Sequence, residues 1–216
     1  MHIPDGFLTA PVCVAGYAVS AAVVGVAARR AGRRMDDLQV PLMGVTGAFV
    51  FAAQMINFPI PFGTSGHLVG TMLLAVLLGA QPALLVVTCI LIVQCLLFQD
   101  GGVAALGANV FNMAVLPVAV GYPAYIWIRK LLSRWRNGWL AGAAVAAWLT
   151  VVLGAVAASI EIAISGRWPL VQALAVMGGL HAVIGVAEAA ITVAVLAFIA
   201  RVRRDLAPAP PSEDQE

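Results

Sequence analysis

Charged residues are scarce in this chain. Only 10% of its 216 residues are Asp, Glu, Lys or Arg, whereas soluble domains carry about 25%. Hydrophobic residues make up 62%, and the apolar runs approach or exceed the roughly 18 residues that mark a membrane-spanning helix. The composition excludes an ordinary soluble domain. The short alternating segments of a membrane β-barrel are also lacking, so the sequence predicts an all-α integral membrane protein.

Several motifs of enzymes and transporters are missing as well. The sequence contains no GxxxxGK[ST] phosphate loop, no HExxH pair and no GxSxG elbow, which argues against an ATPase or an intramembrane hydrolase. It also has no CxxC motif. Cys13, Cys89 and Cys95 are far apart in the sequence, and we interpret them as small apolar side chains. No internal repeat of the kind found in many secondary transporters is visible. We therefore expect a chain that is not an enzyme and has no ATPase of its own.

Seven apolar segments are present, separated where charge, proline and glycine gather. The third is short for a crossing of roughly 20 residues, and the seventh is long enough to tilt. The segments are approximately Ala10–Ala28, Val40–Ile56, His67–Gly79, Ala83–Phe98, Asn109–Ile128, Trp139–Ile160 and Val171–Ala200.

The basic residues indicate the orientation of these segments. Eleven of the twelve fall after segment one, between segments five and six, or after segment seven. With seven crossings these three clusters share one face, which the positive-inside rule makes cytoplasmic. The N-terminus is then outside, in a multi-pass protein of a bacterial or archaeal cytoplasmic membrane. The clusters are Arg29, Arg30, Arg33 and Arg34, then Arg129, Lys130, Arg134 and Arg136, and finally Arg201, Arg203 and Arg204.

The domain organisation follows from the same count. Residues 1–204 form one transmembrane domain, and the Pro-rich, acidic stretch 205–216 is expected to be a disordered cytoplasmic tail. Three stretches rich in glycine, proline or polar residues, 1–6, 57–67 and 98–109, fall together on the outer face. They are either the walls of a binding site or three ordinary loops.

The first residues, MHIPDG, offer an unusual set of nitrogen donors. The α-amine of Met1, the amide nitrogen of His2 and its imidazole Nδ1 can close two fused chelate rings on one metal. Three nitrogens in a plane leave a fourth position, which is the geometry of Ni(II) or Cu(II). Pro4, Asp5 and Gly6 are turn-forming residues that can fold this segment back. The alternative is an exposed histidine without a ligand.

His67 could supply the fourth nitrogen. It stands in GTSGHLVG, where we expect a helix capped by Thr64 or Ser65, with its dipole disfavouring protonation of His67. A capped histidine that faces water is the simpler interpretation. Two histidines on one face favour a metal site.

Other polar residues have weaker indications. His181 and Glu188 lie seven residues apart on one face of the last segment, either as a proton or metal relay or as a buried structural pair. Asn57, Ser65, Asn109 and Asn112 can orient ligands from a second shell, or the asparagines can join helices.

At these residues the sequence resembles a known family. MHIPDGFL, GTSGHLVG and DGGVAALGANVFNM are similar to motifs of CbiM/NikM proteins, the substrate-binding membrane subunits of cobalt and nickel energy-coupling-factor (ECF) transporters. The resemblance covers about residues 1–200. It implies seven helices with an external N-terminus, and a metal held by the Met1 amine, the His2 amide and imidazole, and His67. SGHL replaces the CSHP-type motif of some cobalt members, which favours nickel while cobalt stays open.

The resemblance also implies partners: a transmembrane coupling subunit, two ATPase subunits and often a small accessory membrane protein. The chain would capture Ni(II) or Co(II) outside and deliver it when ATP drives reorientation. It would need no resident cofactor. The alternative function is a self-contained secondary transporter in which His181 and Glu188 relay protons.

Overall fold

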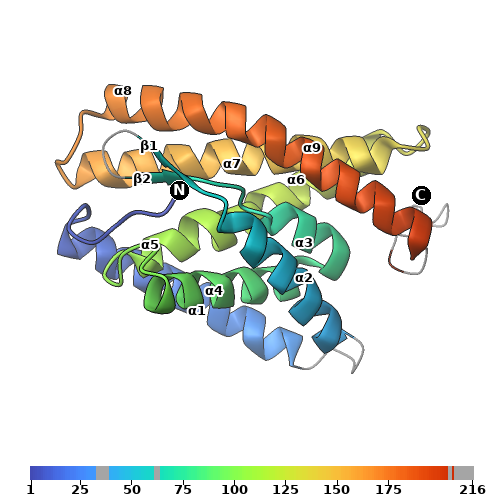
Figure 1. Ribbon diagram of the computed structural model, residues 1–216, viewed down its shortest axis with the longest axis horizontal. Helices are drawn as coiled ribbons and strands as arrows, with labels where there is room; N and C mark the ends of the chain where they lie inside the picture. The colour runs from blue at the N-terminus through green and yellow to red at the C-terminus, as the bar shows by residue number, and fades with distance from the viewer. Residues whose placement is uncertain (33–38, 61–63, 204–205, 207–216) are drawn as a thin grey trace.

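The computed structural model of the chain describes residues 1–32, 39–60, 64–203 and 206. Within them the protein is a bundle of long apolar helices, with the first residues folded back toward its middle (Figure 1). The expected disordered tail, residues 205–216, lies outside the described residues apart from Leu206.

The helices match the predicted apolar segments to within a few residues, except for the third. Helix 106–131 includes two π-helical stretches, and helix 170–202 includes one. The described helices are α1 (Ala10–Ala31), α2 (Gln39–Gln54), α3 (Thr71–Leu78), α4 (Ala80–Leu97), α5 (Leu106–Val110), α6 (Tyr122–Leu131), α7 (Gly138–Ile164), α8 (Leu170–Ala173) and α9 (Gly179–Val202).

Five helices in the described part of the chain are long and apolar enough to cross a membrane, and α2 is a shorter apolar helix. This confirms the predicted all-α membrane fold. The third predicted segment differs because only Thr71–Leu78 is helical. At about 1.5 Å per residue, α3 is far shorter than the bilayer core. Apart from half-buried Leu77, all its residues are buried, so α3 belongs to the core.

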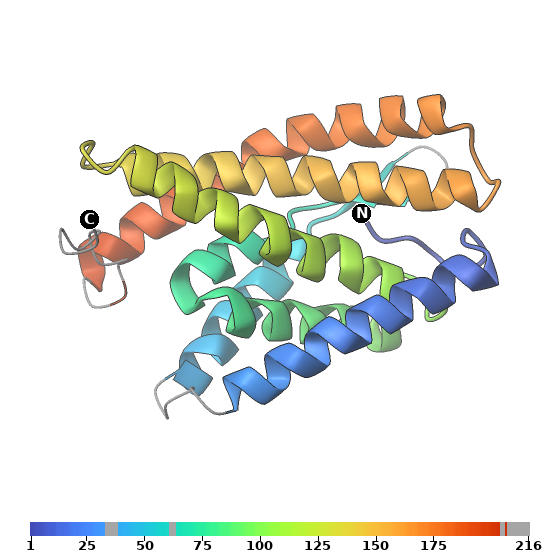
Figure 2. The same ribbon diagram turned by 180° about the vertical axis from the view of Figure 1, so that it is seen from behind.

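The long helices form two packed groups. In the first, α7 lies along α9 and α6, and in the second, α1 crosses α4 and α5. Helices α3 and α4 join the groups in the middle, as both views show (Figures 1 and 2). The basic ends of α1, α6 and α9 lie at one end of the bundle, while the loop before α1 lies at the other (Figure 1).

A close approach of α1 to α5 fixes the position of the second group. A Cβ atom at Gly107 would lie 2.3 Å from the backbone nitrogen of Tyr17, and one at Gly16 would lie 2.7 Å from that of Ala108. The Ser20 hydroxyl donates to the Gly107 carbonyl at 2.7 Å. Glycines thus let two backbones touch, as small residues do between membrane helices. The contact places α5 beside the N-terminal residues.

The described residues contain one small antiparallel ribbon. Strands β1 (Phe58–Ile60) and β2 (Thr64–Gly66) pair with Pro59 opposite Ser65. The expectation that Thr64 or Ser65 caps a helix at His67 is therefore wrong. The α3 helix begins at Thr71 after Gly70, whose φ of 72° only glycine adopts readily. His67 lies on the connection between ribbon and helix, so no helix dipole acts directly on it.

Candidate metal-binding site

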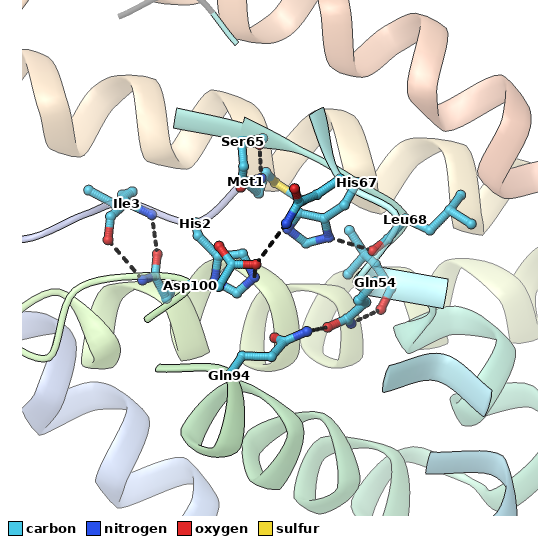
Figure 3. Close-up of polar contacts among 12 residues, drawn as sticks. Met1, His2, Ile3, Gln54, Ser65, His67, Leu68, Gln94 and Asp100 are labelled. Atoms are coloured by element: carbon cyan, nitrogen blue, oxygen red, sulfur yellow. Dashed lines mark hydrogen bonds and ion pairs between the residues drawn. The ribbon is translucent and has the colours of Figure 1, made fainter. Parts of the chain in front are cut away.

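The first five residues lie in an extended arm that enters the bundle from the loop before α1 (Figures 1 and 3). The Met1 amine donates to the Ser65 carbonyl on β2. Asn109 of α5 binds the Ile3 backbone twice: its Oδ1 accepts from the amide at 2.8 Å, and its Nδ2 donates to the carbonyl at 3.1 Å. The Gly102 amide also donates to the Ile3 carbonyl at 3.0 Å. The arm is therefore fixed on both sides.

The turn predicted at IPDG is confirmed, with Gly6 at a φ of 83°. The Asp5 side chain binds a segment that is far from its own turn in the sequence. Its carboxylate accepts from the backbone amides of Val103 at 3.1 Å and Ala104 at 2.8 Å. These two hydrogen bonds hold the arm against the loop between α4 and α5.

In that loop, Gly101 leaves room for the His2 ring because it has no side chain. Its φ of 92° suits glycine, and a Cβ atom there would lie 3.0 Å from His2 Nδ1 and from Asn109 Nδ2. A larger residue would push His2 away from the position it occupies.

The histidine of the arm and the histidine that follows β2 meet inside the bundle. The rings of His2 and His67 stack with centroids 4.6 Å apart and planes inclined by 28°. Both side chains are buried, at 3% and 1% exposure. The predicted convergence of the N-terminus on His67 is thus present in the structure (Figure 3).

The contacts of each ring indicate which nitrogen is free. His67 Nδ1 lies 2.6 Å from the Leu68 carbonyl, which can only accept, so Nδ1 carries the proton and Nε2 keeps the lone pair. In His2, Nε2 lies 3.6 Å from Asp100 Oδ2. A proton on Nε2 would face this carboxylate and leave Nδ1 free. Neither Nε2 atom has a hydrogen-bond partner.

Burial keeps these nitrogens neutral. It lowers the pKa of the Met1 amine from 8.0 to about 4, partly opposed by the charge of Asp100. Burial, with the nearby N-terminal charge, lowers the pKa of His2 from 6.5 to about 3. The same two causes, in that order, hold the pKa of His67 well below its usual value. Neutral amine and imidazole nitrogens are the forms that bind metals.

The connection 67–70 that carries His67 is held from three helices. Both oxygens of Glu188 on α9 accept from backbone amides, from Val69 at 2.7 Å and from Gly70 at 2.6 Å. Gln54 of α2 donates to the Val69 carbonyl at 2.6 Å and accepts from Gln94 of α4 at 2.9 Å. His67 is thus fixed through the backbone that follows it (Figure 3).

The four suggested second-shell residues have different surroundings. Asn109 holds the arm, and Ser65 accepts from the Met1 amine through its carbonyl. Asn57 is exposed and donates to Asp100 Oδ2 at 3.0 Å, so it reaches His2 only through that carboxylate. Asn112 donates to Glu161 of α7 at 2.7 Å.

His181 and Glu188 also have separate surroundings. Glu188 binds the connection before α3, while His181 Nδ1 donates to the Met177 carbonyl at 2.7 Å. The seven-residue spacing puts both on the inner face of α9, with 0% and 3% exposure.

Sequence reasoning did not identify the roles of Asp100 and Glu188. Asp100 belongs to the DGG stretch that was singled out for its glycines, and its acidic side chain beside a predicted site was the available signal. For Glu188 the signal was an ionisable residue at membrane depth, but the sequence could not name a backbone 118 residues away as its partner.

Comparison with known proteins identifies a family and several relatives of this chain. The family described as CbiM, cobalt uptake substrate-specific transmembrane region, matches residues 2–206. A putative fused nickel transport protein, NikMN, of Archaeoglobus fulgidus is 42% identical over 209 residues, which cover 95% of this chain and 68% of that protein. A putative metal transport protein of Haloquadratum walsbyi is 40% identical over 209 residues, covering 95% and 93% of the two chains.

Solved structures agree with this relationship. A crystal structure described as a truncated transition metal transporter superposes on this fold with a TM-score of 0.86 and 35% identity, covering 94% of this chain and 99% of the other. The resemblance first suggested by the N-terminal motif is thereby confirmed over almost the full length. This multi-pass membrane protein belongs to the CbiM family of cobalt-uptake transmembrane proteins.

Proposed function

We propose that this chain is the substrate-capturing component of an ECF-type ABC importer for Ni(II) or Co(II). It binds the metal from the outside of a cytoplasmic membrane. A transmembrane coupling subunit, two ATPase subunits and in some systems a small accessory membrane protein complete the transporter. ATP hydrolysis by those partners drives the reorientation that delivers the metal, so the chain itself hydrolyses nothing.

One observation carries this proposal: the Met1 amine and the rings of His2 and His67 converge in the buried interior, where burial keeps their nitrogens neutral. The donors proposed are the amine, the amide and Nδ1 of His2, and Nε2 of His67. Such a planar set suits Ni(II), and related names include both nickel and cobalt transport proteins. Asn109 and Ser65 position the arm, Asn57 acts through Asp100, and Asn112 supports the neighbouring helices.

The contacts of Glu188 disfavour the alternative of a self-contained secondary transporter. A proton relay needs a carboxylate that is free to exchange protons. Both oxygens of Glu188 instead accept short hydrogen bonds from the backbone amides of Val69 and Gly70, so the carboxylate is engaged in holding the chain.

Blocking the N-terminus is the direct test. One alanine placed before Met1, or acetylation of Met1, moves or removes the amine without changing any side chain. We expect Ni(II) and Co(II) affinity, measured by titration calorimetry on the purified full chain, to fall by about a hundredfold or more, since loss of outer-shell groups alone costs 10–100-fold.

A matched control carries the same alanine after Glu216 and should bind metal normally. Normal binding by the N-terminally blocked protein would disprove the proposed ligand set.

A further inference from the structure

The side chain of Met1 is buried in the interior, although it belongs to the first residue of the chain. It is 0% exposed and is part of the main cluster of buried apolar side chains. Terminal residues are usually poorly ordered unless something holds them. The proposed ligand set uses only the amine of this residue, so it does not account for the buried thioether side chain.

Gly154 of α7 leaves the space for this side chain. A Cβ atom at Gly154 would lie 2.9 Å from Met1 Sδ and 3.3 Å from Met1 Cε. It would also lie 2.9 Å from the carbonyl oxygen of Asn112, which belongs to the π-helical stretch Phe111–Val115. Such stretches are frequent at functional sites. The Met1 side chain therefore ends where α7 and the π-helical stretch meet, in a place that any side chain at residue 154 would narrow.

This contact adds a third attachment to the arm. Asn109 holds the backbone of Ile3, and the Met1 amine donates to the Ser65 carbonyl (Figure 3). A neutral amine has two N–H groups and one lone pair, so this hydrogen bond leaves the lone pair free for a metal. One hydrogen bond alone lets the amine swing about its acceptor. A buried side chain on the same Cα atom restricts that movement.

We propose that the Met1 side chain positions the amine of the capture site, and that the space beside Gly154 is the pocket that receives it. This inference rests on the proposed capture of Ni(II) or Co(II) by the Met1 amine. A chain that begins with a small residue retains the amine, the amide and the imidazole, but its amine is no longer held in place. The pocket acts through packing of a large apolar side chain, which Leu also has, and not through a bond from Sδ to the metal.

A removable N-terminal extension allows the first residue to be varied. The full chain is purified with an extension that a site-specific protease cuts directly before residue 1, in three forms: unaltered, Met1→Leu and Met1→Ala. After cleavage we expect the Ni(II) affinity of Met1→Leu, measured by titration calorimetry, to be within about threefold of that of the unaltered chain. The affinity of Met1→Ala should fall about tenfold or more, because the buried apolar contact is lost.

Free peptides provide the control for these variants. Met-His-Ile-Pro-Asp and Ala-His-Ile-Pro-Asp have the same nitrogen donors and no pocket. Their Ni(II) affinities should therefore agree within about twofold, which is less than tenfold discrimination requires. A difference that is present in the protein and absent in the peptides comes from the fold.

Gly154→Ala tests the same contact from the helix. We expect this substitution to lower Ni(II) affinity about tenfold in the unaltered chain and less in Met1→Ala, since residues in contact have non-additive effects. The approach to the Asn112 carbonyl is the same in both chains and cancels in the comparison. Gly142→Ala is the matched control, because Gly142 is a buried glycine of α7 whose added Cβ atom would lie 3.3 Å from the Tyr125 carbonyl oxygen. If Gly154→Ala does not fold, the three chains that differ at residue 1 decide the question.

Two results would overturn the inference. Equal Ni(II) affinity of the unaltered and Met1→Ala chains would show that the side chain does not position the amine. A loss for Met1→Leu as large as that for Met1→Ala would mean that Sδ itself binds the metal. Failure of the proposed function would look different, because the uncut chains would then bind Ni(II) as tightly as the cut ones.

Discussion

Two clusters of buried polar groups lie next to each other in this protein, and their hydrogen bonding differs. In the capture site, His67 Nε2, one of the proposed ligand atoms, has no hydrogen-bond partner. In the brace formed by Glu188, Gln54 and Gln94, both carboxylate oxygens and both ends of the Gln54 amide are occupied, and only Gln94 Oε1 has no partner. The first cluster has capacity for a ligand, whereas the second holds backbone in place.

This difference separates residues that bind from residues that position. A buried group is normally satisfied, so the unsatisfied lone pair of His67 Nε2 beside His2 and the Met1 amine indicates an external partner. A carboxylate that accepts hydrogen bonds from two backbone amides, as Glu188 does, has a structural role. Substitutions in the two clusters should therefore differ in the size and the nature of their effects.

The largest effect is expected for His67→Ala in the capture site. It removes one of four proposed nitrogen ligands, and we expect Ni(II) affinity to fall by about a hundredfold or more, since even outer-shell losses cost 10–100-fold. Titration calorimetry on the purified chain measures this. His181→Asn is the matched control, with an equally buried ring but no proposed part in capture. Equal losses in both variants would mean that the distinction between them is wrong.

Asn109→Ala should come next, because it acts on the arm and not on the metal. The Ile3 amide loses its partner, and the Ile3 carbonyl keeps only Gly102. We expect metal affinity to fall by between about ten- and a hundredfold.

Asn112→Ala provides the comparison, since Asn112 is a buried asparagine of the same helix that binds Glu161. We expect the Ni(II) affinity of this variant to stay within about twofold of that of the unaltered chain, a smaller change than the roughly 10–100-fold loss expected when a group that positions a ligand is removed. If the two variants behaved alike, the clamp on Ile3 would have no special role.

The sequence predicted the fold and the meeting of His2 with His67. Apolar length predicted the helices, since a bilayer requires long uncharged runs. Pro4, Asp5 and Gly6 predicted that the first residues fold back, because they are turn-forming residues and glycine readily adopts the positive φ that this turn requires. His67 was identified as the partner of His2, although for a partly incorrect reason.

The contacts that hold the site were beyond sequence reasoning. Thr64 and Ser65 suit a helix cap by local propensity, but pairing with Ile60 and Pro59 makes them part of a strand. Asp5, Asp100, Asn109 and Glu188 bind backbone or side chains 43 to 119 residues away. Local propensity carries no information on such distant partners, so their polar character was visible while their function was not.

Glu188→Gln tests the brace itself. The amide keeps one acceptor oxygen but sets an NH₂ group against a backbone N–H, and it removes a charge that strengthens both bonds. We expect the connection 67–70 to loosen, with metal affinity reduced by about three- to tenfold and a lower thermal unfolding midpoint.

Glu161→Gln is the matched control because Glu161 accepts from a side-chain amide and not from the His67 connection. It should leave affinity unchanged. A loss as large as that of His67→Ala would place Glu188 among the ligands instead of the brace.

The smallest expected effect is in the pH dependence of metal binding. Binding releases protons, so affinity rises with pH. Because the pKa of the buried Met1 amine is already about 4 and that of His2 about 3, neither nitrogen carries a proton above pH 5. Only the His2 amide proton must then leave, and affinity should rise about tenfold per pH unit between roughly pH 5 and pH 8. A free Met-His-Ile-Pro-Asp peptide, whose amine has a pKa near 8, must also release amine and imidazole protons and should show a steeper slope. Calorimetric titration of both at several pH values measures the difference, and equal slopes would mean that burial in the arm does not prepare these nitrogens for the metal.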